Sequence, residues 1–427
     1  MTDLVIRGGT VVDATGSRRA DVAVTAGHVE AVAATIDPPP GAVVLDAGGC
    51  VVAPGLVDLH VHLRQPGFEE AETVETGARA AALGGYTAVV AMPNTDPAID
   101  CAAVVREVLD LGATAPCQVF VAGALTVGRD GERLAPLGEM ADLGVRLFTD
   151  DGAGLQDTRL MRRALEYASS LGVTLAQHCE DAALATGGHM HEGDWSSKLG
   201  IPGIPSEAEE LMVMRDIALS RLTGAPVHFL HLSTAGSVAL VRGAKAGGVR
   251  VTAEAAPHHF VLTDACAETF DPVFKVNPPL RTDADVEAVR AGLADGTIDA
   301  IATDHAPHPS EAKDQTWEEA PPGMLGLETA LALALVELDI PVARLLEVMS
   351  WAPARLAGIS DRHGGPIDEG RPANVCVIDP AAEWTVDPHQ LASRSHNTPY
   401  AGRRLTGRVR HTVLHGEPVV VDGESQR

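Results

Sequence analysis

Apolar, β-branched runs recur through the middle of the chain, and residues with a helical spacing of apolar positions lie between them. The runs fall at residues 56–62, 86–91, 118–123, 145–149, 173–178, 227–231, 249–254 and 299–303. Helical patterns lie, for example, at 157–171, 207–223, 234–246 and 282–293. Ser206 with Glu209 resembles a capping box at one helix start. This alternation predicts an α/β fold, a (β/α)8 TIM-type barrel. A doubly wound open sheet is the alternative, although no GxGxxG motif follows the first run.

Both ends of the chain show a different pattern, in which short period-2 alternation is broken by glycine turns. Residues 1–53 and 365–427 share this pattern, which is typical of short antiparallel strands. We expect the two ends to form one small β domain, with residues 54–364 as the catalytic barrel.

Composition and charge exclude several classes of partner. The chain has 32 Lys and Arg against 58 Asp and Glu, a formal charge of -26, whereas nucleic acid and anionic membranes need a basic surface. The 6 cysteines form no CxxC motif and fit reduced thiols. Residues 1–30 do not resemble a signal peptide, and no apolar run approaches the roughly 18–20 residues of a membrane span. We therefore expect a cytoplasmic protein that acts on a small molecule.

Histidine and aspartate side chains, which commonly bind metal ions, lie at the ends of the predicted strands. In a parallel barrel the carboxyl ends of the strands carry the active site. The residues at these ends are His60, His62, His178, His231 and Asp304, together with Asp150 or Asp151 after the fourth strand. Imidazole and carboxylate ligands suit zinc, among other divalent metals. Six ligands are too many for one tetrahedral ion, so two ions about 3.5–4 Å apart that share a carboxylate and a water fit better.

Three further features are interpreted as surface, structural or loop segments and not as part of the active site. His189 and His191 lie in the glycine-rich segment GGHMHEGDW, which we interpret as surface or lid. His258 and His259 follow the seventh run, where a structural role or support of the ligands is expected. We interpret the acidic stretch 311–323 as a solvated, mobile loop. It follows the eighth strand, where a lid would also be placed.

The order of the motifs resembles the bacterial type I dihydroorotases, in the cyclic amidohydrolase branch of the amidohydrolase superfamily. The matching segments are DLHVHLRQPG, AMPNTDP, FTDDG, QHCED, HLST, NPPLR, ATDHAPH and NTPYAG, and the match covers nearly the whole chain. The resemblance implies reversible ring closure of N-carbamoyl-L-aspartate to L-dihydroorotate in pyrimidine biosynthesis. It also implies about two Zn2+ ions. His60, His62 and Asp304 would hold one ion and His178 with His231 the other. Asp151 and a hydroxide would bridge them.

The lysines of this chain bear on the bridging ligand. Hydantoinases and many allantoinases bridge their metals with a carboxylated lysine on the fourth strand. The first lysine here is Lys198, well beyond that strand. The bridge must therefore be an acid, and Asp151 is in place.

Substrate-binding positions follow from the same resemblance. The planar guanidinium of Arg64 suits bidentate binding of a carboxylate. The other matching positions are His62, Asn94, Asn277, His308, Pro322 and Gly323. Pro322 stands where the family often has an aromatic residue. Since proline has no N–H, any backbone donor at this position is lost.

Asp304 is the expected catalytic acid/base. In hydrolysis it would accept the proton of the attacking hydroxide and deliver it to the ring nitrogen. In cyclisation it must start protonated, which favours cyclisation at lower pH. The alternatives are an allantoinase, a metal-dependent deaminase, or a non-catalytic structural partner of aspartate transcarbamoylase. We expect a homo-oligomer, with aspartate transcarbamoylase as the candidate protein partner.

Overall fold

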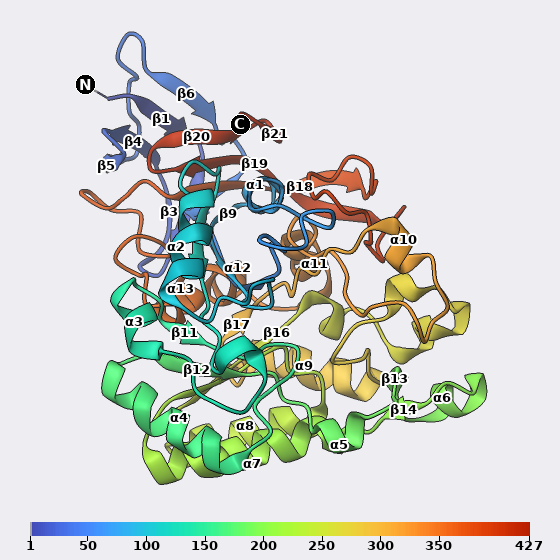
Figure 1. The fold of residues 1–427 in the computed structure, drawn as a ribbon. Helices are drawn as coiled ribbons and strands as arrows, with labels where there is room; N and C mark the ends of the chain where they lie inside the picture. Colours follow the sequence, from blue (N-terminus) through green and yellow to red (C-terminus); the bar gives the residue numbers. More distant parts are fainter. Residues whose placement is uncertain (1) are drawn as a thin grey trace.

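Parallel strands form a barrel in the computed structural model, which describes residues 2–427 (Figure 1). The strands are β8 (Leu56–Val61), β9 (Tyr86–Ala91), β10 (Gln118–Val121), β11 (Leu147–Phe148), β12 (Thr174–Gln177), β15 (Val227–Phe229), β16 (Val251–Ala255) and β17 (Ala300–Ile301). They form two hydrogen-bonded sets, β10-β9-β8 and β11-β12-β15-β16-β17. Parallel bridges Gly123–Phe148 and Val61–His305 join the two sets. The predicted (β/α)8 barrel is confirmed.

Small and branched side chains fill the barrel. Val57, Ala88, Ala122, Ala176 and Ala300 come from successive parts of the barrel and pack in one buried cluster. A narrow barrel leaves room for such residues in its interior. The strands predicted at 145–149 and 299–303 pair over only two residues each, because the chain leaves the sheet early where it enters the loops with Asp151 and Asp304.

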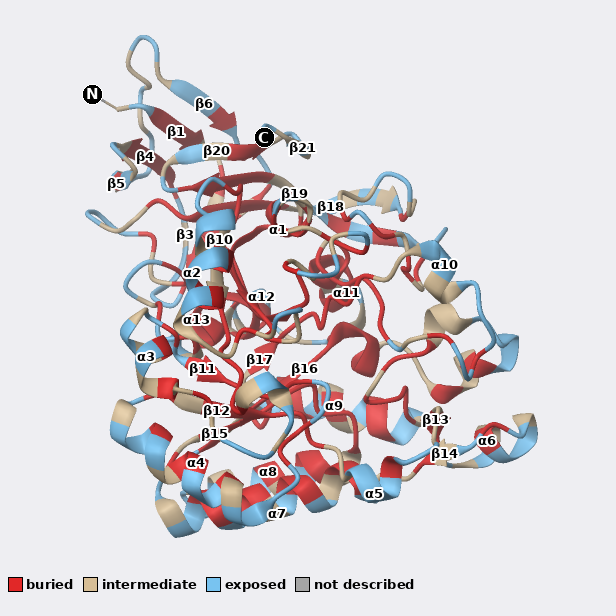
Figure 2. Ribbon diagram, in the orientation of Figure 1, coloured by how far each residue is buried: buried red, intermediate tan, exposed pale blue. Residues whose placement is uncertain are grey.

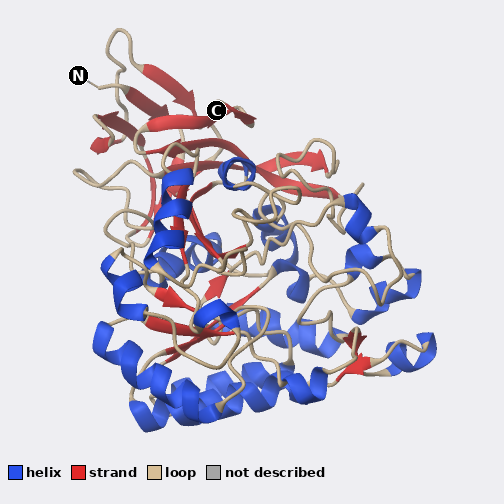
Figure 3. Ribbon diagram, in the orientation of Figure 1, coloured by secondary structure: helices blue, strands red, loops and turns tan. Residues whose placement is uncertain are grey.

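Helices surround the strands (Figure 3). They are α1 (Val74–Leu83), α2 (Ala102–Leu111), α3 (Leu137–Asp142), α4 (Thr158–Leu171), α7 (Glu207–Thr223), α8 (Ala235–Ala246), α9 (Asp283–Asp295), α11 (Ala330–Glu337), α12 (Val342–Leu346) and α13 (Ala352–Leu356). Helix α4 illustrates their origin. Asp157 caps it by accepting from the N–H of Leu160, and Gly172 ends it in the left-handed region. Its buried face repeats at helical spacing, and Figure 2 shows the outer faces of these helices exposed.

The predicted capping box at α7 is wrong. Ser206 has helical dihedral angles and its side chain makes no capping hydrogen bond. The carboxylate of Glu209 instead accepts from the backbone N–H groups of Ser233 and Thr234, at 3.1 Å each. A buried carboxylate needs several donors, and the loop after β15 supplies them.

Both chain ends contribute to one β structure. The strands are β1 (Leu4–Arg7), β2 (Thr10–Asp13), β3 (Gly16–Arg19), β4 (Asp21–Thr25), β5 (His28–Ala33), β6 (Val43–Asp46), β7 (Val51–Pro54), β18 (Val375–Thr385), β19 (Arg404–Leu414), β20 (Glu417–Val421) and β21 (Glu424–Ser425). Strand β7 pairs with both β2 and β18, so it joins the two ends in one sheet. The N and C labels both lie at this β-rich end of the molecule in Figure 1. The small β domain is confirmed, while its boundaries at 53/54 and 364/365 stay a prediction.

The segments beside the barrel mouth are more ordered than predicted. Strands β13 (Met190–His191) and β14 (Gly203–Ile204) pair, and the short helices α5 (Ala182–Ala185) and α6 (Asp194–Leu199) contact them, while α10 (Ser310–Lys313) lies apart from them in Figure 1. Trp317 is only 5% exposed, and Lys313 donates to the carbonyls of Pro272 and Pro321. The expectation of a solvated loop holds for residues 311, 314–316, 318 and 319, which are exposed, whereas Trp317 is buried and Lys313 is half-buried against neighbouring loops.

No helix within residues 2–427 combines the length and the apolarity that a membrane crossing needs.

Candidate metal centre

Two groups of histidine and aspartate side chains meet at the carboxyl ends of the barrel strands. His60, His62 and Asp151 form one group, and Asp151, His178 and His231 form the other. Within each group the nitrogen and oxygen atoms lie within 4.8 Å of one another, and every member is buried. Asp151 belongs to both groups, as a bridging ligand must. Side chains far apart in the chain are thus brought together because they all follow neighbouring strands.

The carboxylate of Asp151 lies at the middle of this cluster. Its Oδ1 is 3.4 Å from His60 Nε2 and 3.5 Å from His231 Nε2. His178 Nδ1 lies 3.7 Å from the same oxygen. Burial alone would raise the pKa of Asp151, but the charge of His60 and the nearby rings of His178 and His231 hold that pKa well below its usual value. The carboxylate is therefore ionised.

Asp304 joins the first group. Its Oδ1 is 3.1 Å from His62 Nε2 and 3.5 Å from His60 Nε2. The backbone at Asp304 is left-handed, with φ at 48°, as it is at His231 and Arg64. Non-glycine residues in this region carry strain, which is concentrated at functional sites in proteins. All six residues predicted as metal ligands are thus close together, and their roles as ligands stay a prediction.

A buried carboxylate that the sequence did not reveal orients His60. Glu254 on β16 accepts from His60 Nδ1 at 3.0 Å and lies 3.0 Å from His228 Nε2. His228 Nδ1 in turn lies 2.9 Å from Thr252 Oγ1. Burial opposes ionisation of Glu254, but its hydrogen bonds with His228 and His60 prevail and lower its pKa to about 2. This arrangement leaves His60 Nε2 free to face Asp151.

Removing the carboxylate of Glu254 is expected to weaken metal binding. Glu254→Ala should lower metal affinity about 10- to 100-fold, the usual effect of losing a partner that orients a ligating histidine. Chelator competition measures this affinity directly. Thr252→Val, which changes only the outer end of the chain, serves as the matched control and should have a much smaller effect. Equal affinities for wild type and Glu254→Ala would contradict the assigned role.

The two adjacent aspartates of the FTDDG segment face different ways. Asp150 Oδ1 accepts from the N–H groups of Leu125 and Thr126, at 2.9 and 3.0 Å. Its Oδ2 accepts from the Thr126 hydroxyl at 2.5 Å. Asp150 therefore holds the loop after β10, while Asp151 points into the histidine cluster.

The predicted substrate-binding residues fall into two sets. In the first, the two amides contact the histidines. His62 Nδ1 donates to Asn94 Oδ1 at 2.9 Å, and Asn277 Nδ2 lies 3.4 Å from His178 Nε2. Asn94 thus orients His62 and keeps its Nδ2 group available at the mouth of the barrel. These contacts place both amides beside the candidate ligands.

The second set lies between the ends of β8 and β17. Arg64 Nε donates to the Pro307 carbonyl at 3.1 Å, and its Nη2 is 3.4 Å from His308 Nε2. Burial and the charge of Arg64 lower the pKa of His308 to about 3, so the ring is neutral at pH 7. His308 Nε2 donates a hydrogen bond to the Pro322 carbonyl at 2.9 Å. The N–H of Gly323 donates to the Lys275 carbonyl at 2.9 Å, so it is engaged within the protein.

His191, His258 and His259 are buried, whereas His189 is only partly buried. His191 is 7% exposed and its Nδ1 lies 3.1 Å from Arg281 Nη1, so it is not a surface residue, and a role of its segment as a lid stays a prediction. Arg281 is itself buried and needs acceptors, which His191 and the Ile204 carbonyl provide. His259 Nε2 donates to the Pro278 carbonyl at 3.0 Å, as expected for a structural role. His258 Nε2 lies 4.0 Å from Asp304.

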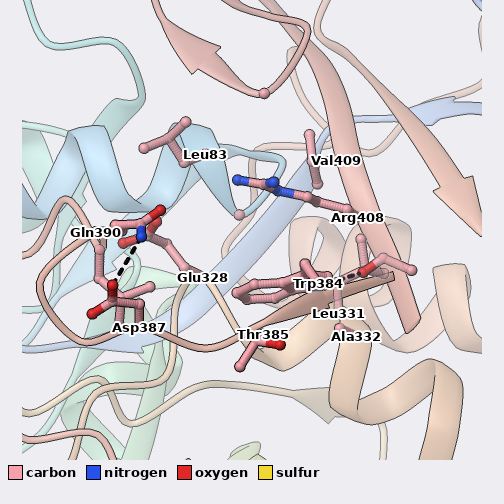
Figure 4. Close-up of a pocket in the computed structure, with 14 residues that line it drawn as sticks. Leu83, Glu328, Leu331, Ala332, Trp384, Thr385, Asp387, Gln390, Arg408 and Val409 are labelled. Carbon is pink, nitrogen blue, oxygen red and sulfur yellow. Dashed lines mark hydrogen bonds between the residues drawn. The ribbon is translucent and has the colours of Figure 1, made fainter. Parts of the chain in front are cut away.

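A separate cavity of about 250 Å³ lies between the barrel and the terminal β structure (Figure 4). Trp384, Arg408 and Glu328 face it, and Gln390 donates to Asp387 at its rim. Burial raises the pKa of Glu328 to about 8. None of the residues that line this cavity belongs to the histidine cluster. The candidate chemistry therefore lies at the barrel mouth and not in this cavity.

Comparison with known proteins gives the family. A family model described as Dihydro-orotase-like matches residues 49–237. The dihydroorotase of Pelotomaculum thermopropionicum is 49% identical over 426 residues, which cover 98% of this chain and 99% of that protein. The dihydroorotase of Streptomyces coelicolor is 49% identical over 431 residues, or 99% of this chain and 100% of that protein.

Solved structures with the same fold include an L-hydantoinase from Arthrobacter aurescens. It has 27% sequence identity and a TM-score of 0.89, and the match covers 100% of this chain and 98% of that one. A dihydropyrimidinase from Brevibacillus agri matches with a TM-score of 0.86 at 23% identity, covers 99% of this chain and 96% of that one, and supports the fold alone. The barrel, its histidine cluster and the full-length sequence similarity agree, and the chain belongs to the dihydroorotase family.

Proposed function

We propose that this chain catalyses the reversible cyclisation of N-carbamoyl-L-aspartate to L-dihydroorotate and water, with the help of two divalent metal ions. One observation carries the proposal: two groups of ligand-type side chains share Asp151 at the barrel mouth. Arg64 and His308, which suit an anionic substrate, lie beside them. The near-full-length similarity to dihydroorotases supports the same substrate.

The donor set fits a pair of zinc ions. Among the described residues, His60 Nε2 and Asp151 Oδ1 are buried and lack a hydrogen-bond partner, which is costly unless a ligand completes them. Imidazole and carboxylate donors suit zinc. His60, His62 and Asp304 would hold one ion, His178 and His231 the other, and Asp151 both. When bound, the ions would supply an activated water as nucleophile and would polarise the carbonyl group that it attacks.

Asp304 is the proposed acid/base. Its carboxylate contacts both His60 and His62, so it faces the centre of the cluster. In hydrolysis, Oδ1 or Oδ2 would accept a proton from the attacking water and pass it to the ring nitrogen that leaves. In cyclisation the same proton would move in the opposite direction. No other carboxylate of the cluster is available for this task, because Asp151 is shared by both groups of ligands.

Arg64 and His308 are proposed to bind the carboxylate that the ring and open forms share. Arg64 Nη1 and Nη2 can form a planar pair of hydrogen bonds to this group. Burial lowers the pKa of Arg64 to about 10, so its guanidinium remains charged at pH 7. A charged, half-buried arginine would orient the ring relative to Asp304.

Asn397 is expected to support this carboxylate site from a distant part of the chain. Its Oδ1 accepts from the N–H of His308, and its Nδ2 donates to the carbonyls of Ala306 and Gly323. Asn397→Ala should therefore raise the KM for dihydroorotate about tenfold, with a smaller change in kcat, because the loop that carries His308 loses its anchor. Steady-state kinetics measure the changes in KM and in kcat separately. Thr398→Ala is the neighbouring control, and an unchanged KM in Asn397→Ala would contradict this role.

A substrate panel tests the proposal. Metal-replete enzyme should hydrolyse L-dihydroorotate and should not hydrolyse allantoin or hydantoin, because both lack the carboxylate for Arg64. Since ring closure turns a dianion into a monoanion and consumes one proton, the equilibrium ratio of ring to open form should rise about tenfold for each unit of falling pH. Turnover of allantoin without turnover of dihydroorotate would identify a different cyclic amidohydrolase.

Association with other chains stays a prediction. We propose that the chain forms a homo-oligomer and that aspartate transcarbamoylase is its candidate partner. Light scattering of the purified chain, alone and with aspartate transcarbamoylase, measures the mass of the homo-oligomer and of the mixed complex. A mass of about 44.4 kDa under all conditions would contradict both predictions.

A further inference from the structure

Helix α7 has apolar side chains on the face that points away from the barrel. The exposed positions that share this face by helical spacing are Glu207, Leu211, Met214, Ala218, Arg221 and Leu222. Leu211, Met214 and Leu222 are 46%, 49% and 62% exposed, and within residues 2–427 no other large apolar side chain is as exposed as Leu222. The opposite face packs Met212 and Val213 into the core. Apolar side chains therefore occupy both faces of one helix.

The neighbouring helix α4 shows how a barrel helix that faces water is built in this chain. Its outer positions carry Arg159, Arg162 and Arg163, and Glu166 pairs with the last two. A helix on the surface of a barrel needs apolar residues only on the side that faces the strands. Helix α7 departs from this pattern over 17 residues, a length of about 25 Å. A contiguous apolar face of this kind marks a surface that another protein surface covers.

The apolar face continues onto α5 and lies at one edge of the molecule. Helix α5 contacts α7, and its Leu184 is 42% exposed. In Figure 1, α4, α5, α7 and α8 lie together on the side opposite the terminal β structure. Figure 2 shows exposed segments along this same side. The face is therefore accessible to a partner as large as a second chain.

The charges at the two ends of this face favour a second copy of the chain as the partner. The face begins at the acidic Glu207 and ends at the basic Arg221. When two copies of α7 run antiparallel, each Glu207 lies opposite the Arg221 of the other copy, and the two-fold axis passes near Met214, midway between them. The apolar positions then meet at the centre, with opposite charges paired at both ends. A face that is complementary to itself in this way fits a two-fold dimer.

We propose that the outer face of α7, with Leu184 at its edge, is a two-fold interface between two copies of this chain. The inference rests on the homo-oligomer proposed above and deepens it by naming the contact, and it is independent of the reaction that the chain catalyses. Leu211, Met214 and Leu222 of both chains form the core of the contact. The Glu207–Arg221 pairs form its rim and set the antiparallel direction of the helices.

Light scattering of the full-length chain over a range of concentrations tests the core of the contact. Wild type should have about twice the 44.4 kDa mass of one chain. L222E and M214E should each raise the dissociation constant of the dimer more than about 100-fold, because each places two charges in a desolvated contact. V336E changes a side chain that is 50% exposed on α11, so it is the matched control and should remain dimeric.

Exchange of the two charges tests the direction of the helices. E207R or R221E alone places like charges opposite each other at both ends of the contact and should raise the dissociation constant about tenfold. The double variant E207R/R221E restores opposite charges in the antiparallel arrangement, so its constant should lie within about threefold of the wild-type value. A partner other than a second copy would not produce this recovery.

Cross-linking keeps the test decisive if a charged variant does not fold, which circular dichroism reveals. Because Met214 lies near the two-fold axis, a short bis-maleimide should join M214C to its own copy. V336C and wild type are the controls and should not be joined. Absence of the cross-linked dimer in folded M214C would overturn the interface.

The remaining outcomes also decide the proposal. A wild-type mass of one chain at all concentrations would overturn the interface together with the homo-oligomer. A dimer that persists in folded L222E and M214E would leave the homo-oligomer in place and show that its contact lies on another surface. A monomer that binds aspartate transcarbamoylase and loses this binding in L222E would assign the face to that partner and overturn the proposal. Turnover of dihydroorotate by wild type is measured separately and tests the proposed reaction alone.

Discussion

Asp304→Asn is expected to reduce turnover of dihydroorotate by about 10²- to 10⁴-fold, the usual contribution of a positioned general acid/base. Asparagine keeps the size of the side chain and an oxygen that can face His62, but it cannot accept and return a proton. The loss should therefore appear in kcat in both directions of the reaction. Steady-state rates of hydrolysis and cyclisation, measured at saturating substrate, give this value.

The same variant should retain its fold and most of its metal. Circular dichroism and metal analysis check these two points. Asp142→Asn, at the exposed end of α3, is the matched control for an aspartate-to-asparagine change and should have wild-type rates. If Asp304→Asn kept the wild-type rate with a full complement of metal, the acid/base role would belong to another group.

Asp151→Ala is expected to eliminate both metal binding and activity. Asp151 is the one residue that belongs to both groups of ligand-type side chains, so its removal would take a ligand from each proposed ion at once. We expect the metal content to fall from about two ions to less than about one per chain, with activity below detection. Metal analysis after gel filtration, together with the hydrolysis assay, measures both effects.

Its sequence neighbour provides the sharpest control. Asp150 is also buried, but its carboxylate binds the backbone at Leu125 and Thr126. Asp150→Asn should therefore keep the metal while lowering the free energy of unfolding by about 1–3 kcal/mol, because a buried donor loses its acceptor. The opposite pattern, in which Asp150→Asn loses metal and Asp151→Ala keeps it, would mean that the bridging residue has been misidentified.

The candidate ligands could be predicted from the sequence because each follows an apolar run. Parallel strands in a barrel end at one face, so the positions of His60, His178, His231 and Asp304 along the chain already implied that they meet. The absence of a lysine before Lys198 also excluded one kind of bridge without any structure. These inferences rest on local pattern and a single geometric rule, which is why the structure agrees with them.

The supporting residues could not be predicted in the same way. Glu254 lies within a buried strand, where a single acidic residue was the only signal, and its partners His60 and His228 are distant in sequence. Asn397 contacts the His308 loop across 89 residues. Such pairs depend on how the loops pack, which no local periodicity specifies.

Glu209 shows how tertiary contacts override a local motif. Its spacing from Ser206 matched a capping box, but the loop at Ser233 and Thr234 offers the carboxylate more donors than the helix start does. The acidic segment around Trp317 is also anchored by tertiary contacts, since Lys275 and Lys313 donate to carbonyls that hold it in place. Composition alone does not reveal such anchors.

The most direct test of this account is a metal titration of the apoenzyme with hydrolysis of L-dihydroorotate followed on the same sample. We expect negligible turnover without metal and a rise in activity that ends at about two zinc ions per chain. Two bound ions without turnover would support the metal centre but would show that the substrate is a different cyclic amide. Full turnover in the metal-free enzyme would contradict the central claim, because the shared carboxylate of Asp151 would then have no metal to bridge.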